Sequence, residues 1–259
     1  MLRTVDSLNG YTIHATDDEL GKVEDVYFDD QKWGVRYLVV ETGSWLSKRT
    51  VLISPYSITG VDDLGKAINV SLTRDQVRNS PSIDTYQPIS RRMELQHTSY
   101  YGYGNYWTGP HLWGVAGSPV YPVGEGMPAP TPSDSAQNQN QDVVGSDDVH
   151  LRSSDGVSGY YIMGTNGDLG HLKDFMVDDK DWAIRYLLVD TRNWWPGGKK
   201  VLLATHWVER IDWPESRVHV KLTRQQIKDS PEYDEDQPID RDYEERLHEH
   251  YDRTGYWDE

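Results

Sequence analysis

The sequence contains no cysteine, and this absence excludes several classes of protein. Disulfide scaffolds, thiolate metal centres and cysteine nucleophiles all need a thiol. The chain also has no run of about 20 apolar residues, so we predict no membrane-spanning helix. No basic segment followed by an apolar core opens the sequence, so we predict no signal peptide and expect a cytoplasmic protein.

Positive charge is scarce. The 259 residues include 26 Lys and Arg against 42 Asp and Glu, which gives a net charge of −16. Nucleic-acid binding requires basic side chains that neutralise phosphates, and an anionic membrane surface repels an acidic chain. We therefore expect no nucleic-acid partner and no membrane insertion.

Phenylalanine is almost missing, with 2 residues beside 17 Tyr and 10 Trp. Hydrophobic residues make up 36% of the chain, below the roughly 45–50% of an average globular domain. Tyrosine and tryptophan combine an apolar body with a polar tip, which suits half-buried sheet faces and contact surfaces. This balance indicates small modules with thin cores.

An internal repeat is the most informative feature that is present. Residues 10–13 (GYTI) align with residues 159–162 (GYYI), and this offset of 149 aligns many later positions until one extra residue near Pro196 makes it 150. The further matching pairs are Leu20-Gly21 with Leu169-Gly170, Trp33 with Trp182, Arg36-Tyr37-Leu38 with Arg185-Tyr186-Leu187, and Tyr106-Trp107 with Tyr256-Trp257. The chain is therefore predicted to carry two copies of one module.

The copies are separated by a stretch rich in Pro, Gln and Asn that contains no Lys or Arg. We expect three segments: a first module over 1–107, a linker over 108–148 and a second module over 149–259. The later linker lacks the apolar residues needed to order itself. Its early part includes Leu112 and Trp113 and is apolar enough to dock on a module.

Each copy has the pattern of a β-rich module. The strands expected in the first copy cover residues 11–16, 21–30, 35–40, 51–58 and 67–72. Thr73 precedes Gln76 by three residues, as Thr223 precedes Gln226, which predicts a capping box and a short helix in each copy. A second helical stretch is expected over 90–101 and over 240–252.

The strand sequences resemble those of a known family. They are DVYFD and RYLVV at residues 25–29 and 36–40, and DFMVD and RYLLV at residues 174–178 and 185–189. Together with the Leu-Gly pairs, they resemble the PRC-barrel domain. That module also occurs in the photosynthetic reaction centre H subunit and at the C-terminus of a ribosome maturation factor. The resemblance implies a mainly β fold of two small antiparallel β-barrels, each followed by a short helical tail. The membrane helix of the H subunit has no counterpart here.

The sequence offers little support for catalysis. None of the nine histidines lies opposite another histidine when the copies are aligned, and no His-x-x-x-His pair exists. The paired acids lack the spacing of a calcium loop, and no Gly-x-Ser-x-Gly elbow is present. We expect a non-enzymatic protein with no catalytic residues, no metal and no cofactor. A hydrolase with a nucleophile and base brought together by folding remains an alternative.

Two arginines, Arg36 and Arg185, lie inside otherwise apolar strand sequences. A buried guanidinium needs a charged partner, and Asp25 and Asp174 on the preceding strands are the predicted ones. We expect structural ion pairs, with an anion or ligand site as the alternative.

Five aromatic residues are candidates for an exposed contact surface. Trp45, Trp194 and Trp195 fall in the loop after the third expected strand, while Tyr101 and Tyr103 belong to the first tail. Contiguous surface aromatics mark binding sites. The alternative is that each tail folds back over its own barrel and caps it.

The function that we expect is protein interaction or scaffolding, through a protein partner or self-association. The two barrels can also pair within the chain as a pseudo-dimer. Two alternatives rest on the family resemblance: an accessory factor of RNA metabolism or ribosome assembly, and a soluble protein associated with the photosynthetic reaction centre.

Overall fold

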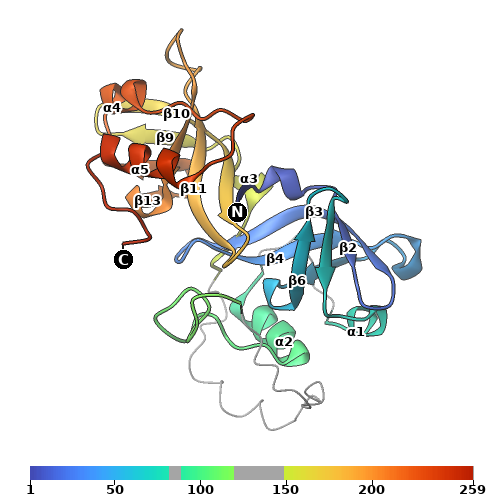
Figure 1. The fold of residues 1–259 in the computed structure, drawn as a ribbon. Helices are drawn as coiled ribbons and strands as arrows, with labels where there is room; N and C mark the ends of the chain where they lie inside the picture. Colours follow the sequence, from blue (N-terminus) through green and yellow to red (C-terminus); the bar gives the residue numbers. More distant parts are fainter. Residues whose placement is uncertain (82–88, 120–148, 259) are drawn as a thin grey trace. The chain divides into compact units, whose positions relative to one another are not determined.

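A computed structural model describes residues 1–81, 89–119 and 149–258, which form two compact units (Figure 1). The first-repeat unit comprises Ser7–Ser153 and Asp179–Ala183. The second-repeat unit comprises Met1–Asp6, Ser154–Asp178 and Ile184–Glu259. Each unit therefore contains a piece of the other repeat. The predicted boundaries at 107 and 149 remain predictions, and most of the predicted linker lies outside the described residues.

Six strands form the sheet of the first-repeat unit in the order β6-β7-β2-β3-β4-β5. They are β2 (Thr12–His14), β3 (Glu19–Asp29), β4 (Gly34–Glu41), β5 (Thr50–Ile53), β6 (Ile58–Asp62) and β7 (Ala67–Val70). All neighbours are antiparallel except β2 and β7. A seventh strand, β8 (Leu151–Ser153), pairs with the end of β3.

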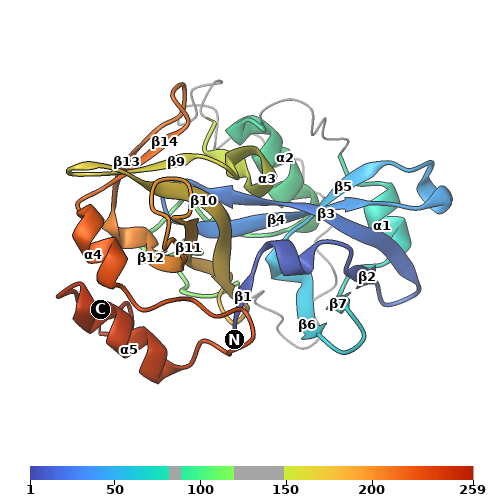
Figure 2. The same cartoon turned by 90° about the horizontal axis from the view of Figure 1, so that it is seen from above.

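The second-repeat unit has the corresponding order β13-β14-β9-β10-β11-β12. These strands are β9 (Tyr161–Gly164), β10 (Gly167–Asp178), β11 (Ala183–Asp190), β12 (Lys200–Ala204), β13 (Val208–Asp212) and β14 (Arg217–Val220). Here the additional strand is β1 (Leu2–Thr4), which runs beside β10 (Figure 2). The predicted mainly β class is confirmed. Among the described strands no ladder joins β5 to β6 or β12 to β13, so closed barrels are not shown.

Local sequence signals explain most of these elements. Both capping boxes form, at Thr73 and Gln76 before α1 (Arg74–Arg78), and at Thr223 and Gln226 before α4 (Arg224–Asp229). The tails contain the predicted longer helices. The remaining helices are α2 (Arg91–Tyr101), α3 (Ser154–Val157) and α5 (Arg241–His250).

One predicted strand is divided. The stretch 51–58 forms β5 and β6 with a 3-10 turn, Pro55–Ser57, between them. Ser54 caps this turn by accepting a hydrogen bond from the Tyr56 backbone N–H, and Pro55 supplies the φ angle that the first helical position requires. The chain therefore changes direction where the pattern predicts one continuous strand.

The Leu-Gly pair before each long strand has a steric cause. Gly21 has a φ of +155° and Gly170 a φ of +137°, within the range that favours glycine. A Cβ atom at Gly21 would collide with the carbonyl oxygen of Glu41, and one at Gly170 with that of Asp190. Only glycine lets the neighbouring strand approach this closely.

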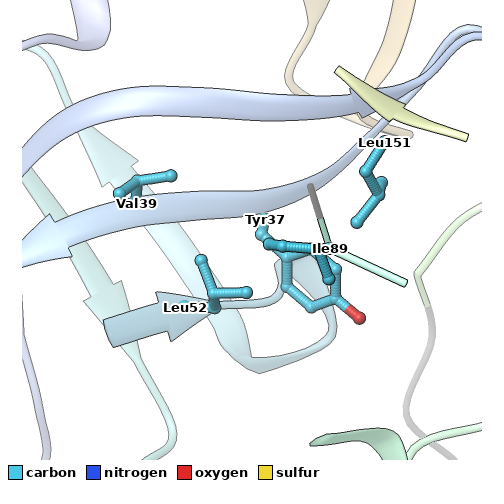
Figure 3. Packing of buried hydrophobic residues seen from close by; sticks show 5 residues of the cluster. All are labelled: Tyr37, Val39, Leu52, Ile89 and Leu151. Carbon is cyan, nitrogen blue, oxygen red and sulfur yellow. The ribbon is translucent and has the colours of Figure 1, made fainter. Parts of the chain in front are cut away.

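The core of the first-repeat unit includes a residue from the second repeat. Tyr37, Val39, Leu52 and Ile89 form a buried cluster with Leu151, which enters from β8 (Figure 3). Leu151 is 6% exposed. Burying a leucine side chain contributes about 1.5–3 kcal/mol. The exchanged strand is therefore part of the core as well as the sheet edge.

Candidate functional site: the tail clusters and the tryptophan loops

A buried polar cluster, the tail cluster, lies within the tail of the first repeat. From α2, Arg91 donates to Glu94 at 2.7 Å and to the Tyr106 hydroxyl at 2.8 Å, and that hydroxyl donates to Glu94. All three side chains are buried. Since each of these polar groups meets another, the cluster joins the helix to the segment that follows it.

Arg36 lies beside this cluster and is 1% exposed. Its guanidinium stacks over the Tyr106 ring at 3.8 Å and over the Trp113 ring at 4.8 Å. Its ion-pair partner is Asp29, at 3.3 Å. Within the described residues, Nε and Nη1 of Arg36 have no hydrogen-bond acceptor, so aromatic rings provide much of its stabilisation.

Arg36 therefore does not pair as the sequence predicts. Asp29, four residues after Asp25, meets Arg36 because it ends β3 at the turn into β4. Asp25 instead accepts a hydrogen bond from the Ser153 hydroxyl at 2.6 Å. In the other unit, Asp174 accepts from the backbone N–H groups of Asp6 and Phe175. The predicted pair of Asp174 with Arg185 stays a prediction.

Burial shifts the pKa of two groups near this cluster. Desolvation raises the pKa of Glu94 to about 7, and this effect outweighs the lowering by Arg91. Desolvation also lowers the pKa of His97 to about 4. The Nε2 atom of His97 lies 3.0 Å from the Leu52 carbonyl oxygen, which can only accept, so the neutral ring carries its proton on Nε2.

The second-repeat unit contains a counterpart of the cluster. Glu244 accepts from the hydroxyls of Tyr186 at 2.8 Å and Tyr256 at 3.0 Å, and it pairs with Arg241 at 3.2 Å. The guanidinium of Arg185 stacks on the Tyr256 ring at 4.0 Å. In both units the tail therefore packs on its own repeat, as the capping alternative predicts for the Tyr-Trp pairs.

The tail tyrosines do not form an open surface. Tyr101 is 8% exposed and stacks on Tyr103, with ring centroids 5.3 Å apart. Tyr103 stacks in turn on Tyr56 at 5.2 Å. The prediction of an exposed contact surface is wrong for Tyr101, because this residue is buried against the rings of His97 and Tyr103.

The loop tryptophans are half-buried and rest on basic side chains. The indole N–H of Trp45 donates to the Leu20 carbonyl oxygen at 2.7 Å, and Arg74 of α1 lies 4.9 Å from its ring. Trp194 has Arg224 at 5.0 Å. Cation–π contacts thus hold each loop against the capped helix of its repeat.

Trp195 is the loop tryptophan without a counterpart in the first copy, where Leu46 takes its position. It lies 5.4 Å from Lys228 and packs near Trp194, with centroids 6.2 Å apart. Trp195 is therefore the most distinctive member of the predicted contact surface.

Within the described ranges, no group of three or more His, Asp or Glu side chains is placed to hold a metal ion. None of the helices in the described part of the chain is long and apolar enough to cross a membrane.

In the first-repeat unit, the strands β2 to β7, the Leu20-Gly21 pair and the β3–β4 hairpin all lie within a stretch that is similar to known proteins. Residues 3–77 match the PRC-barrel domain family. This match supports the resemblance for the first repeat. A protein of Deinococcus radiodurans, described only as an uncharacterized protein, is 34% identical over 76 residues. The match covers 29% of this chain and 27% of that relative, so the chain spans about a quarter of the relative's length.

Proposed function

We propose that this chain is a non-enzymatic protein-interaction or scaffold protein that consists of two PRC-barrel modules. The match of residues 3–77 to the PRC-barrel family supports the first module. The equal strand order of the second-repeat unit supports extending the assignment to the second.

The observation that carries this proposal is that each unit binds an extended segment from outside its own repeat. β3 accepts β8, and β10 accepts β1, both as antiparallel strands. Binding of an extended segment along a sheet edge is a common mode of protein recognition, with backbone hydrogen bonds giving affinity and side chains giving specificity.

The buried ionisable groups support an interaction role over catalysis. In the tail cluster, Arg91 pairs with Glu94, and the nearby Arg36 stacks on the Tyr106 ring. These contacts connect elements of the fold. Because all three groups are buried and their contacts lie within the fold, the cluster favours a structural role.

Trp195 offers the most direct test. The tagged full chain would be used to capture proteins from its native host, in parallel with Trp195→Ala and with the matched control Leu46→Ala from the first copy. We expect a partner that is retained by the wild type and the control and at least tenfold depleted with Trp195→Ala. Equal recovery by all three chains would contradict a contact role for Trp195.

The same capture distinguishes the alternatives. Recovery of ribosomal particles would favour the RNA-metabolism role, and recovery of reaction-centre proteins would favour the photosynthetic one. If no partner is recovered at a stoichiometric level, the interaction role is not supported.

A further inference from the structure

The first strands of the two repeats are exchanged, and the exchange is reciprocal. Leu2 lies opposite Asp178 in the second-repeat unit, and Leu151 lies opposite Asp29 in the first-repeat unit. Leu151 is the repeat counterpart of Leu2, and Asp29 that of Asp178. The two acceptor edges therefore bind equivalent segments in the same register.

The acceptor edges also hold their segments by equivalent groups. Asp25 on β3 accepts from the Ser153 hydroxyl at 2.6 Å, while its counterpart Asp174 on β10 accepts from the Asp6 N–H at 3.3 Å. The N–H of Val5, which is 2% exposed, donates to the Phe175 carbonyl oxygen at 2.9 Å. Each carboxylate thus secures the end of the incoming strand.

The two segments differ little, since β1 is Leu-Arg-Thr and β8 is Leu-Arg-Ser. An edge that accepts such a strand in one register recognises an apolar residue, an arginine and a hydroxyl in sequence. Nothing in this recognition depends on whether the segment belongs to the same chain.

We propose that the edge of β10 binds residues 1–6 of a second copy of this chain, so that two chains form a dimer by exchanging their first strands. This inference rests on the proposed interaction role and names its partner.

The energetic reason is that exchange between chains replaces each contact with an identical one. Only the tether favours the intrachain arrangement, and a short flexible tether corresponds to an effective concentration on the order of a millimolar. Ser7 is the first residue after the bound segment, in the short 3-10 helix Asp6–Leu8, and it is exposed and can serve as the hinge. Exchange of identical elements about such a hinge is a low-cost route to dimers.

Two single-cysteine chains test the proposal, because the protein has no cysteine of its own. Thr4 lies opposite Met176, so a chain with Thr4→Cys can form a disulfide with a chain carrying Met176→Cys only if the strand crosses between chains. The mixture would be unfolded, refolded at about 1 mM or at about 10 µM, and oxidised.

After refolding at the higher concentration, we expect a disulfide-linked species of twice the 29.8 kDa chain mass, at least fivefold more abundant than after dilute refolding. The matched control pairs Thr4→Cys with Asp178→Cys, two residues out of register, and should yield little product. Equal yields from the two pairs would overturn the proposal.

Light scattering on the unmodified chain keeps the test independent of the substitutions. We expect the same refolding to give a dimer of wild-type protein. If the wild type stays monomeric at both concentrations, the proposal is wrong. It is also wrong if the wild type forms a dimer but the cysteine variants form no mixed disulfide. Only purified chains are used here, so a negative result does not affect the test by capture of a host partner. A negative capture experiment likewise does not affect the test of dimer formation.

Discussion

At the scale of single residues, Arg36 and Arg185 share one arrangement. Each guanidinium stacks on a tyrosine from the tail of its own repeat, at 3.8 Å for Tyr106 and 4.0 Å for Tyr256. A cation near an aromatic face contributes roughly 0.5–2 kcal/mol, more when water is excluded. The arginine in an apolar strand therefore has a structural explanation, since it holds the tail.

Replacing Arg36 tests this explanation. Arg36→Met should lower the free energy of unfolding by about 3–5 kcal/mol, because Asp29 would be left buried without its partner. Urea denaturation of the full chain measures the loss. Arg36→Met combined with Asp29→Asn should recover part of it, since the unpaired charge is gone. A single variant as stable as wild type would contradict the structural role.

Glu94 makes stability depend on pH. Its pKa is raised to about 7 in the folded protein, so the folded state holds this proton more tightly than the unfolded state. The stabilising contribution is present below the ordinary pKa of 4.5 and is lost as pH rises through 7. The shift corresponds to a loss of about 3 kcal/mol.

The variant Glu94→Gln should remove that loss. We expect its free energy of unfolding, relative to wild type, to rise as pH increases from 4.5 to 8. Urea denaturation at a series of pH values measures the difference. The His97 ring, whose pKa is lowered to about 4, acts in the opposite direction in both proteins and cancels in the comparison. A difference that is constant with pH would show that Glu94 does not titrate in this range.

At the scale of elements, the sequence predicted what depends on nearby residues. The apolar run 35–40 lies in β4, and the two predicted capping boxes begin α1 and α4. The strands β1 and β8 were missed, because three residues are too few to show a period. The pairing of Arg36 was also missed, since two acids on one strand are equally plausible partners until the hairpin turn is placed.

An intrachain disulfide tests the strand exchange directly. In a chain with Thr4→Cys and Met176→Cys, we expect an intrachain bond to form in dilute solution, seen as faster migration on a non-reducing gel. The matched control carries Thr4→Cys with Tyr27→Cys. Tyr27 lies opposite Ser153, which is the position that Thr4 would occupy without exchange. A bond in the control alone would show that β1 stays with its own repeat.

At the scale of the whole molecule, the exchange means that each unit is completed by the other repeat. Residues Met1–Asp6 belong to the second-repeat unit, while Ser7 begins the first-repeat unit. A truncation at the N-terminus should therefore affect a sheet that lies far away in the sequence.

Hydrogen exchange can locate this effect. Deleting residues 1–6 should speed amide exchange in β10 at least tenfold, because the edge loses its antiparallel partner, and should change β3 little. The reciprocal variant Leu151→Asp places a charge in the buried cluster of the first-repeat unit and should speed exchange in β3 instead. Faster exchange in β3 after the deletion would contradict the exchanged arrangement.

The sequence alone predicted the mainly β class and the capped helices, which the structure confirms, because these follow from residue spacing along a few turns of chain. It also predicted the repeat and the resemblance to the PRC-barrel family, and the family match supports the resemblance over residues 3–77. The tertiary structure decided which aspartate meets Arg36 and which repeat receives each first strand. The two first strands, Leu-Arg-Thr and Leu-Arg-Ser, are nearly the same in sequence, so their local chemistry does not predict which edge each one joins. Only the pairing of β1 with β10 and of β8 with β3 in the folded chain shows the outcome, because strand pairing joins residues far apart in the sequence.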